Sequence, residues 1–422
     1  MENSLEKTVL VTADGIPLKT SLARAQRRSK FVAFSMVLPL LTFVLIAFLI
    51  PIADMLSLSV DNSITKEILP KSVIALQNWD ETSGELPDEV VFAAIVEEIK
   101  KAKIARKHTR VGQRLNYESS GFSSLFRKAG RKVKKINKPP YKEALIKSDK
   151  RWGQLYTWQV IKQFSAEYTD GYYLAALDFK RNPATGNIES LPGKESIYLK
   201  LFWRTMLLSS LITFLTFIIG FPLAYMLATV STRLSNILII FVLLPFWTSL
   251  LVRTTSWIAL LQQEGVINDF LVLVGIISED GRLAMIHNAT GTVVAMTHIL
   301  LPFMILPLFS VMKTIPKSYV RAAVSLGAHP WMAFWKVYFP NTVAGIGAGS
   351  ILVFIIAIGY YITPALVGGS SGTFISNRIA YHISSSLNWG LGAALGVILL
   401  GIVLALFVLY DRIVGIDNMK LN

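Results

Sequence analysis

A set of long apolar runs with few or no charges limits most strongly what this chain can fold into. The runs cover residues 31–56, 206–228, 237–260, 291–312, 344–367 and 391–410. Each is long enough, at about 1.5 Å per residue, to cross roughly 30 Å of hydrocarbon as a helix. Barrel strands would instead alternate apolar and polar residues over about ten positions. The sequence therefore predicts an all-α membrane bundle of six transmembrane helices.

Composition agrees with a membrane protein and removes several classes of site. Apolar residues make up 53% of the chain and charged residues 16%, against about 25% charged residues in soluble domains. The formal charge of +15 suits anionic lipid or acidic proteins, and in a membrane protein Lys and Arg gather in loops, so we expect no nucleic-acid partner. The chain has no cysteine, and its five histidines lack metal-ligand spacing. We predict no catalytic residue, no metal site and no enzyme activity.

The distribution of positive charge orients the predicted spans. Basic residues precede the first span, follow the sixth, and recur in the second-to-third and fourth-to-fifth connections; they are Arg24, Arg27, Arg28, Lys30, Arg233, Lys313, Lys317, Arg321, Lys336 and Arg412. Short loops of this kind face the cytoplasm. The sequence therefore predicts a cytoplasmic tail at residues 1–30, a first transmembrane helix at 31–59, a five-helix core at 199–413 and a second cytoplasmic tail at 414–422.

Residues 60–198 form a long connection that this topology places outside the cytoplasm. Pro87-Asp88 opens a helical pattern, and residues 142–149 and 158–164 offer further helices. The midsection is strongly basic, which fits a solvated face or a disordered segment and leaves contact with anionic lipid or a binding protein open. Long loops cross the membrane largely regardless of charge. We expect a mostly helical periplasmic insert.

The cytoplasmic loop at residues 314–340 splits into two short helices. Gly327 permits a backbone conformation that ends the first, and Pro330 fits the first turn of the second, which Pro340 is expected to stop before the fifth span. Ala322, Ala323 and Leu326 share a face of the first helix, and Trp331, Phe334, Trp335 and Tyr338 form an aromatic stripe on the second. Two interpretations follow: an amphipathic helix lying in the membrane interface, or an elbow that docks in a groove of another protein.

This loop resembles the EAA loop of ABC-importer permeases, whose pattern is roughly E-A-A-x-x-x-G, then an apolar helix and Leu-Pro. The matching positions are Ala322, Ala323, Leu326, Gly327, Ala328 and Pro340. The resemblance extends from about residue 201 to the C-terminus, and residues 244–247, 251–254, 300–303 and 359–369 resemble the spermidine/putrescine-type permeases in particular. It implies a type I importer permease that crosses the bacterial inner membrane several times, with the charge pattern placing both termini in the cytoplasm.

The resemblance also implies partners. In that family the loop seats in a cleft of a cytoplasmic ATPase, so we expect two copies of an ATP-binding subunit, a second permease subunit and a periplasmic solute-binding protein, within membrane lipid. Arg321 stands where the family has an acidic residue, and it would repel a basic group on the ATPase. The chain has no phosphate-binding loop motif. We therefore expect no cofactor on this chain and ATP bound by the partner subunits.

Polar groups inside the predicted spans are the candidates for a substrate pathway, because burying them in lipid is costly. Arg253, in the outer half of the third span, would face a cavity, snorkel towards the outer interface or pair across a subunit contact. His298 would line the pathway or join two helices by a hydrogen bond. Tyr360 and Tyr361 in the fifth span would offer cation–π contacts to an ammonium substrate.

Together these features predict an importer permease for a small polar solute, with a polyamine as the leading substrate class. An opine, another amino-acid derivative or an iron chelate stays open, because a basic external insert does not suit the capture of polycations. A secondary transporter or channel, and a membrane-bound sensor, are the alternatives from other classes. The EAA-like loop argues against both, since neither needs a cytoplasmic elbow.

Overall fold

The computed structural model describes residues 18–193 and 195–414, with side chains placed within 26–193 and 195–412. In this part of the chain, five helices are long and apolar enough to cross a membrane, and a bent pair makes a sixth when it counts as one span. The all-α membrane bundle expected from the apolar runs is therefore confirmed. The tail at 415–422 and residues 1–17 of the other tail lie outside the described residues.

The first span belongs to a separate N-terminal unit that ends at Ser57. It consists of α1 (Leu18–Val44), the π-helical turn η1 (Leu45–Leu49) and α2 (Ile50–Ser57). The Ile50 N–H donates to the Leu45 carbonyl, five residues back, directly before Pro51. A proline ring crowds the carbonyl four residues before it, and the wider π turn relieves that clash. The helix therefore continues through its proline.

The insert after the first span is a helical body with its own core. That core is built around Phe92, Trp152 and Trp158, with the Phe92 and Trp158 ring centroids 4.6 Å apart. The helices expected after Pro87-Asp88 and near residues 142–149 and 158–164 are present as α5, α8 and α9. The helical elements are α3 (Ser63–Ile68), α4 (Pro70–Gln77), α5 (Glu89–Ile104), α6 (His108–Glu118), α7 (Phe122–Lys132), η2 (Val133–Lys135), α8 (Tyr141–Ser148), η3 (Lys150–Gly153), α9 (Leu155–Gln163) and α10 (Gly171–Ala176). An antiparallel hairpin of β1 (Phe179–Arg181) and β2 (Ile188–Ser190) adds strands that the sequence does not predict.

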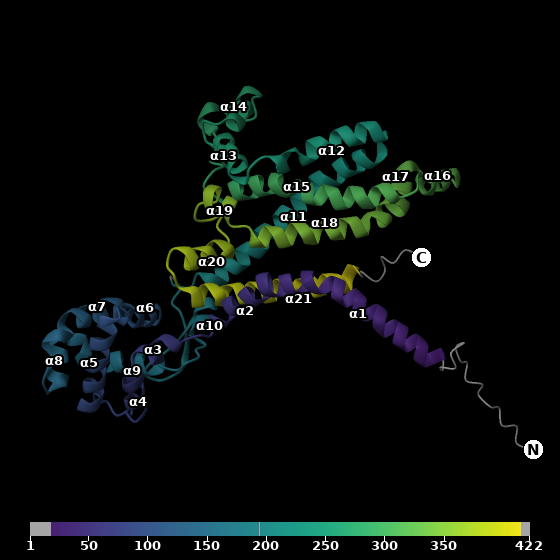
Figure 1. Cartoon of the computed structure of the whole chain (residues 1–422). Helices are drawn as coiled ribbons and strands as arrows, with labels where there is room; N and C mark the ends of the chain where they lie inside the picture. The colour runs from purple at the N-terminus through teal and green to yellow at the C-terminus, as the bar shows by residue number, and fades with distance from the viewer. Residues whose placement is uncertain (1–17, 194, 415–422) are drawn as a thin grey trace, which may run out of the picture. The chain divides into compact units, whose positions relative to one another are not determined.

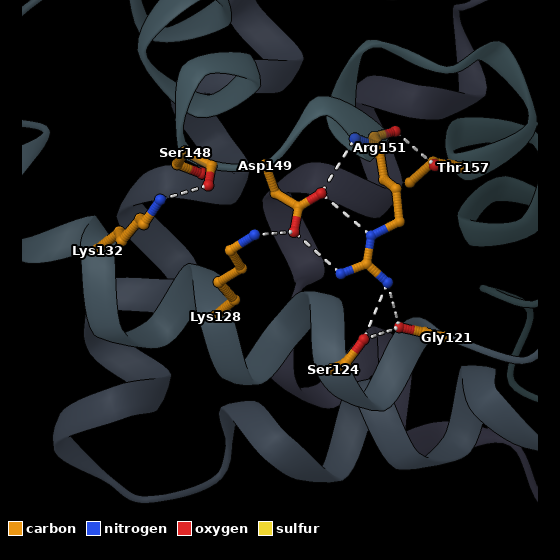
Figure 2. Close-up of polar contacts among 8 residues, drawn as sticks. All are labelled: Gly121, Ser124, Lys128, Lys132, Ser148, Asp149, Arg151 and Thr157. Carbon is orange, nitrogen blue, oxygen red and sulfur yellow. Dashed lines mark hydrogen bonds and ion pairs between the residues drawn. The ribbon is translucent and has the colours of Figure 1, made fainter.

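Asp149 anchors the basic midsection of the insert (Figure 2). Its buried carboxylate lies 3.0 Å from Nζ of Lys128 on α7 and 2.9 Å from the Arg151 guanidinium. Arg151 also donates to the Gly121 carbonyl over 2.8 Å, which ties η3 to the residue that precedes α7. The Arg151 hydrogen bond, more than any other contact, holds the pKa of Asp149 well below its ordinary value. The basic midsection is thus helical with a solvated face, and the alternative of a disordered segment is wrong.

The membrane core is built on α11 (Tyr198–Thr229), α15 (Ala289–Thr314) and α18 (Phe339–Gly359), which run side by side (Figure 1). α21 (Trp389–Val414) packs against α18 and against α20 (Ile375–Ser384). α18 and α15 approach each other closely, since a Cβ on Gly349 would lie 3.1 Å from the Met304 carbonyl oxygen. Small residues at such contacts let two helix backbones meet closely in lipid.

The third predicted span, residues 237–260, is not one straight helix. It is divided between α12 (Thr232–Trp247) and α13 (Leu250–Leu261), with a bend of 95° between them, and α14 (Val266–Leu273) follows α13. Thr248 has extended backbone (ψ 145°), and the Ser249 side chain accepts a hydrogen bond from the Val252 N–H to cap α13. A short 3-10 turn, η4 (Glu279–Gly281), follows. The expectation of a continuous helix is therefore wrong at this point.

The fifth predicted span, residues 344–367, also ends earlier than expected. α18 stops at Gly359, and α19 (Ile362–Val367) is a separate short helix. In a continuous helix, the ring of Pro364 would clash with the Tyr360 carbonyl. The break frees that carbonyl to accept a hydrogen bond from the Ser376 hydroxyl over 2.7 Å. The proline and this distant partner together set the end of the span.

The insert and the loop after α15 lie at opposite ends of α11. At the N-terminus of α11, the insert residue Asp178 accepts hydrogen bonds of 2.9–3.0 Å from the backbone N–H groups of residues 197–199. At the C-terminus, Nζ of Lys317 donates to the Thr229 carbonyl over 3.4 Å. Because α11 is long enough to span the bilayer, the insert and this loop face opposite sides of the membrane.

Candidate functional site

The loop that resembles the EAA pattern forms an exposed elbow at one end of the bundle (Figure 1). Its first helix is α16 (Lys317–Ser325) and its second begins with α17 (Pro330–Ala333). Gly327 has φ +90°, and the N–H groups of Gly327 and Ala328 donate to the Val324 and Ala323 carbonyls. This is a Schellman motif, which ends a helix with a glycine in the left-handed region. The predicted end of the first helix is confirmed.

The predicted coupling residues cluster around this turn. Leu326 is 90% exposed at the tip. Arg321, Ala322, Gly327 and Pro340 are also exposed, whereas Ala323 and Ala328 are half-buried. The elbow therefore presents an apolar tip and a cation to the surroundings.

The aromatic stripe of the second helix divides its contacts between the bundle and the surface. The Phe334 and Tyr338 rings pack against Tyr225 of α11, with centroids 5.7 and 5.2 Å away. Trp331 and Trp335 stay 67% and 44% exposed. One half of the stripe therefore fixes the elbow to the bundle, as expected for an anchor, and the other half is free to meet lipid or protein.

Pro340 does not stop the second helix. The chain continues as one helical segment from Pro330 to Gly359, through the π-helical turn η5 (Phe334–Tyr338) into α18. The Phe339 N–H donates to the Phe334 carbonyl, five residues back, and the Asn341 side chain donates to the Val337 carbonyl over 2.6 Å. These bonds satisfy the backbone around a proline that offers no N–H. The elbow is thus a direct extension of the fifth span.

Three of the four pathway candidates are brought together, and one is not. The Arg253 charge on α13 acts on both His298 on α15 and Tyr360 after α18, although no hydrogen bond joins these three side chains in the described part of the chain. Its Nε atom is buried without a hydrogen-bond partner. Tyr361 is 47% exposed, and its carbonyl, not its hydroxyl, bonds to Asn377. Arg253, His298 and Tyr360 therefore form one polar cluster from three elements.

Further members of this region were not predicted from the sequence. Nε1 of Trp257 donates to Nδ1 of His298 over 3.1 Å. The hydroxyls of Thr254 and Thr363 lie 3.2 Å apart and link α13 to α19. Trp257 lies one helical turn after Arg253, so an i, i+4 pairing of polar groups in the third span is the signal that would have found it. Thr363 carries no comparable sequence signal.

A cavity of about 280 Å³ adjoins this cluster between α11, α12 and α15. His298 is the one strongly polar side chain on a wall that is otherwise apolar, formed by Leu223, Met226, Leu227, Leu238, Phe241, Val242, Pro245, Leu301, Pro302 and Ile305. His298 thus lies both in the polar cluster and on the wall of this cavity. Within the described residues, no three His, Asp or Glu side chains are grouped to hold a metal ion.

Two acidic residues between α13 and α15 pair with the same arginine. Arg282 lies 2.7 Å from Asp269 and 2.8 Å from Glu279. These exposed ion pairs are typical of a solvated surface loop.

Comparison with known proteins covers the membrane core. The family model for the binding-protein-dependent transport system inner membrane component matches residues 199–415. The spermidine/putrescine transport system permease protein PotB of Haemophilus influenzae is 31% identical over 226 residues, covering 54% of this chain and 78% of that protein. The inner membrane ABC transporter permease protein YdcU of Escherichia coli K12 is 29% identical over 274 residues, covering 63% of this chain and 82% of that protein.

A solved structure of a bacterial alginate ABC transporter, in complex with its alginate pentasaccharide-bound periplasmic protein, is 17% identical with a TM-score of 0.43, covering 53% of this chain and 80% of that one. The family match takes in the exposed elbow, the cluster of Arg253, His298 and Tyr360, and all spans after the first. The chain therefore belongs to the family of inner-membrane components of binding-protein-dependent transport systems, the multi-pass permease subunits of ABC importers.

Proposed function

We propose that this chain forms the translocation pathway of an importer for polyamines or similar amines. It would work with a second permease subunit, two copies of a cytoplasmic ATP-binding subunit and a periplasmic solute-binding protein. The substrate class is supported by relatives that are named spermidine/putrescine permeases, among them the PotB proteins of Haemophilus influenzae and Escherichia coli. The observation that carries the proposal is the exposed elbow at residues 317–333, joined without a break to the fifth span.

In this proposal the elbow is the contact for the ATP-binding subunit. Leu326 and the turn at Gly327 would enter a groove of that subunit, with Ala322, Ala323 and Ala328 allowing close approach and Arg321 setting the charge of the contact. Pro340 would lie within the helix that carries the movement to the spans. The elbow side of the membrane would then be the cytoplasm, with both chain termini there and the insert in the periplasm.

ATP would be bound and hydrolysed by the partner subunits alone. The sequence has no glycine-rich loop followed by Lys and Ser or Thr, which is the arrangement that cradles phosphates in such ATPases. This chain would contribute the pathway and the coupling, and no nucleotide chemistry.

The polar cluster would meet the solute. Trp257 and Tyr360 offer aromatic faces, and an ammonium group binds such faces by cation–π attraction. A second candidate has its own support: the Arg253 Nε atom is buried without a partner, and a solute with a carboxylate would supply one. An opine or another amino-acid derivative would carry both groups, and an iron chelate with carboxylates would suit Arg253 alone.

A solute panel tests the substrate class. The test uses the assembled transporter in proteoliposomes, with its binding protein on the side of the membrane that the insert faces. It should hydrolyse ATP faster with spermidine or putrescine than with an opine or ferric citrate. Stimulation by the carboxylate solutes alone would overturn the polyamine assignment and leave the permease assignment intact.

A substitution at the elbow tests the coupling contact. Leu326→Glu places a charge on the exposed tip and should abolish co-purification of the ATP-binding subunit without lowering the thermal unfolding midpoint. Ile188→Glu is the matched control, because Ile188 is 54% exposed on the hairpin of the insert. Unchanged co-purification in Leu326→Glu would contradict the coupling role.

A further inference from the structure

A second cavity, of about 530 Å³, lies at the base of the elbow. Its walls come from the C-terminal ends of α11 and α15, from α16 and from η5. The lining residues are Tyr225, Ala228, Thr229, Met312, Lys313, Ile315, Pro316, Lys317, Val320, Arg321 and Tyr338. Apolar residues from two spans thus meet basic residues of the loop in one hollow.

Three cations line this cavity at a spacing of four residues: Lys313, Lys317 and Arg321. None of them forms an ion pair with an acidic side chain within the described residues. Lys317 reaches only the Thr229 carbonyl, at 3.4 Å, and Lys313 lies over the Phe309 ring at 5.3 Å. Neither contact neutralises a charge.

The sequence explains why these cations stay unpaired. No Asp or Glu occurs between Asp280 and Asp411, so the loop and both helices that flank it carry no negative side chain. Three like charges around one hollow give it a positive potential, which favours an anion there. An anionic group that binds there must come from outside this stretch of the chain.

Tyr338 adds a buried donor to the same wall. Tyr338 as a whole is 8% exposed, and its hydroxyl oxygen is buried with no hydrogen-bond partner. Leaving such a group unpaired is costly, and native structures rarely do so without a missing ligand or water. A hydroxyl donor beside three cations suits an oxyanion.

We propose that this cavity binds the phosphate group of an anionic phospholipid. The ends of two spans, the Tyr225 and Tyr338 pair and the following lysines mark headgroup level in the bilayer. Basic pockets between transmembrane helices are typical sites for such headgroups. Met312, Ile315 and Ala228 supply an apolar wall for the start of the acyl chains. An acidic side chain of another subunit needs far less room than this hollow offers.

Such a lipid would touch the end of α11 and the first helix of the elbow at once. It would therefore hold α16 in place beside the bundle and favour docking of the ATP-binding subunit. This consequence for coupling rests on the function proposed above, whereas lipid binding itself does not. The two are tested by separate measurements.

Lipid retention tests the site directly. The purified transporter, incubated with equal phosphatidylglycerol and phosphatidylcholine and then washed, should retain phosphatidylglycerol on this subunit in native mass spectra. The double variant Lys313→Gln/Lys317→Gln and the single variant Tyr338→Phe should each lose at least about tenfold in retention, since each removes a bond to a charged group. Arg233→Gln is the control, because Arg233 is exposed just after α11 but lies outside the cavity lining.

Three outcomes would overturn the proposal. Equal retention of the two lipids would mean that the cavity does not select anionic headgroups, and an equal loss in Arg233→Gln would mean a diffuse charge effect. Displacement of the lipid by millimolar inorganic phosphate would mean a site for free phosphate. Normal lipid retention in the double variant, with loss of the ATP-binding subunit on co-purification, would mean that the cavity receives an acidic protein side chain. Equal unfolding midpoints of the variants in pure detergent show that the fold is intact.

Discussion

The indole Nε1 of Trp257 donates a hydrogen bond to Nδ1 of His298 over 3.1 Å, with the ring centroids 5.3 Å apart. Because an indole nitrogen is a donor only, Nδ1 of His298 must accept, and Nε2 then carries the proton of the neutral ring. The bond joins α13, beyond the bend in the third span, to α15 at the edge of the cavity between α11, α12 and α15. This pair therefore links the broken third span to the unbroken helix α15.

Trp257→Phe should weaken this link while keeping an aromatic ring. The lost hydrogen bond is worth about 1 kcal/mol, or roughly fivefold in a conformational equilibrium. We expect a several-fold lower solute uptake per ATP hydrolysed in proteoliposomes. Trp203→Phe is the matched control, since Trp203 is 71% exposed on α11. Equal uptake by the two variants would remove Trp257 from the pathway.

Gly327→Ala should disturb the elbow through backbone strain alone. Gly327 has φ +90° and open space around its Cα, so a methyl group meets no neighbour but the backbone is forced into an unfavourable region. The cost is about 1–2 kcal/mol. We expect weaker co-purification of the ATP-binding subunit. Gly359→Ala, which also has open space but an ordinary φ, should leave it unchanged; the same loss in both variants would contradict this reasoning.

Asp178→Asn should destabilise the joint between the insert and the second span. The carboxylate caps the N-terminus of α11 with both oxygens, since Oδ1 accepts from Ile197 and Tyr198 and Oδ2 from Leu199. An asparagine keeps one acceptor and removes the negative charge that favours a helix N-terminus, at a cost of about 1–2 kcal/mol. A lower thermal unfolding midpoint is expected. Glu189→Gln on the exposed strand β2 should show no such fall.

Stability should fall in acid because of His382 on α20. Its ring nitrogens lie 2.9 Å from the Tyr198 and Ser386 hydroxyls, and burial, with a smaller effect from Arg378, lowers the pKa of His382 to about 4. The unfolded chain takes up the proton near pH 6.5, whereas the folded protein stays neutral down to about pH 4. The free energy of unfolding therefore loses nothing to this group above about pH 6.5, and it declines as the pH falls from there towards 4.

The pH dependence of the unfolding midpoint checks this. His382→Gln keeps a side chain that bonds to both hydroxyls but does not titrate, so the decline between pH 6.5 and 4 should become shallower. An identical pH profile in the variant would assign the acid sensitivity to other groups.

The apolar runs were enough to predict the spans because burial in lipid is a local property of composition. Their breaks were not predictable, because the effect of a proline depends on distant partners. Pro222 and Pro302 lie within unbroken helices, whereas Pro364 coincides with a break whose free carbonyl meets Ser376. The prediction that Pro340 ends its helix was wrong for the same reason. A π turn and the Asn341 side chain satisfy the backbone there, and the helix continues.

In the candidate site too, local features were predictable and features that depend on distant contacts were not. The turn at Gly327 follows from local backbone preferences, and the sequence predicted it. The cluster of Arg253, His298 and Tyr360 needed three elements to meet, and only the intramembrane polarity of each residue pointed to it. The separation of Tyr361 from that cluster depends on the break at Tyr360, which no local pattern shows.

The thirty residues from Pro330 to Gly359 form one rod of roughly 45 Å. Gly349 packs against Met304 between the two ends of this rod. In the coupling proposed above, a push on the Trp331 end would swing the Gly359 end the opposite way about this contact, as the two arms of a lever do. Tyr360 follows Gly359 directly, so the stroke would reach the polar cluster as a displacement of one of its own members.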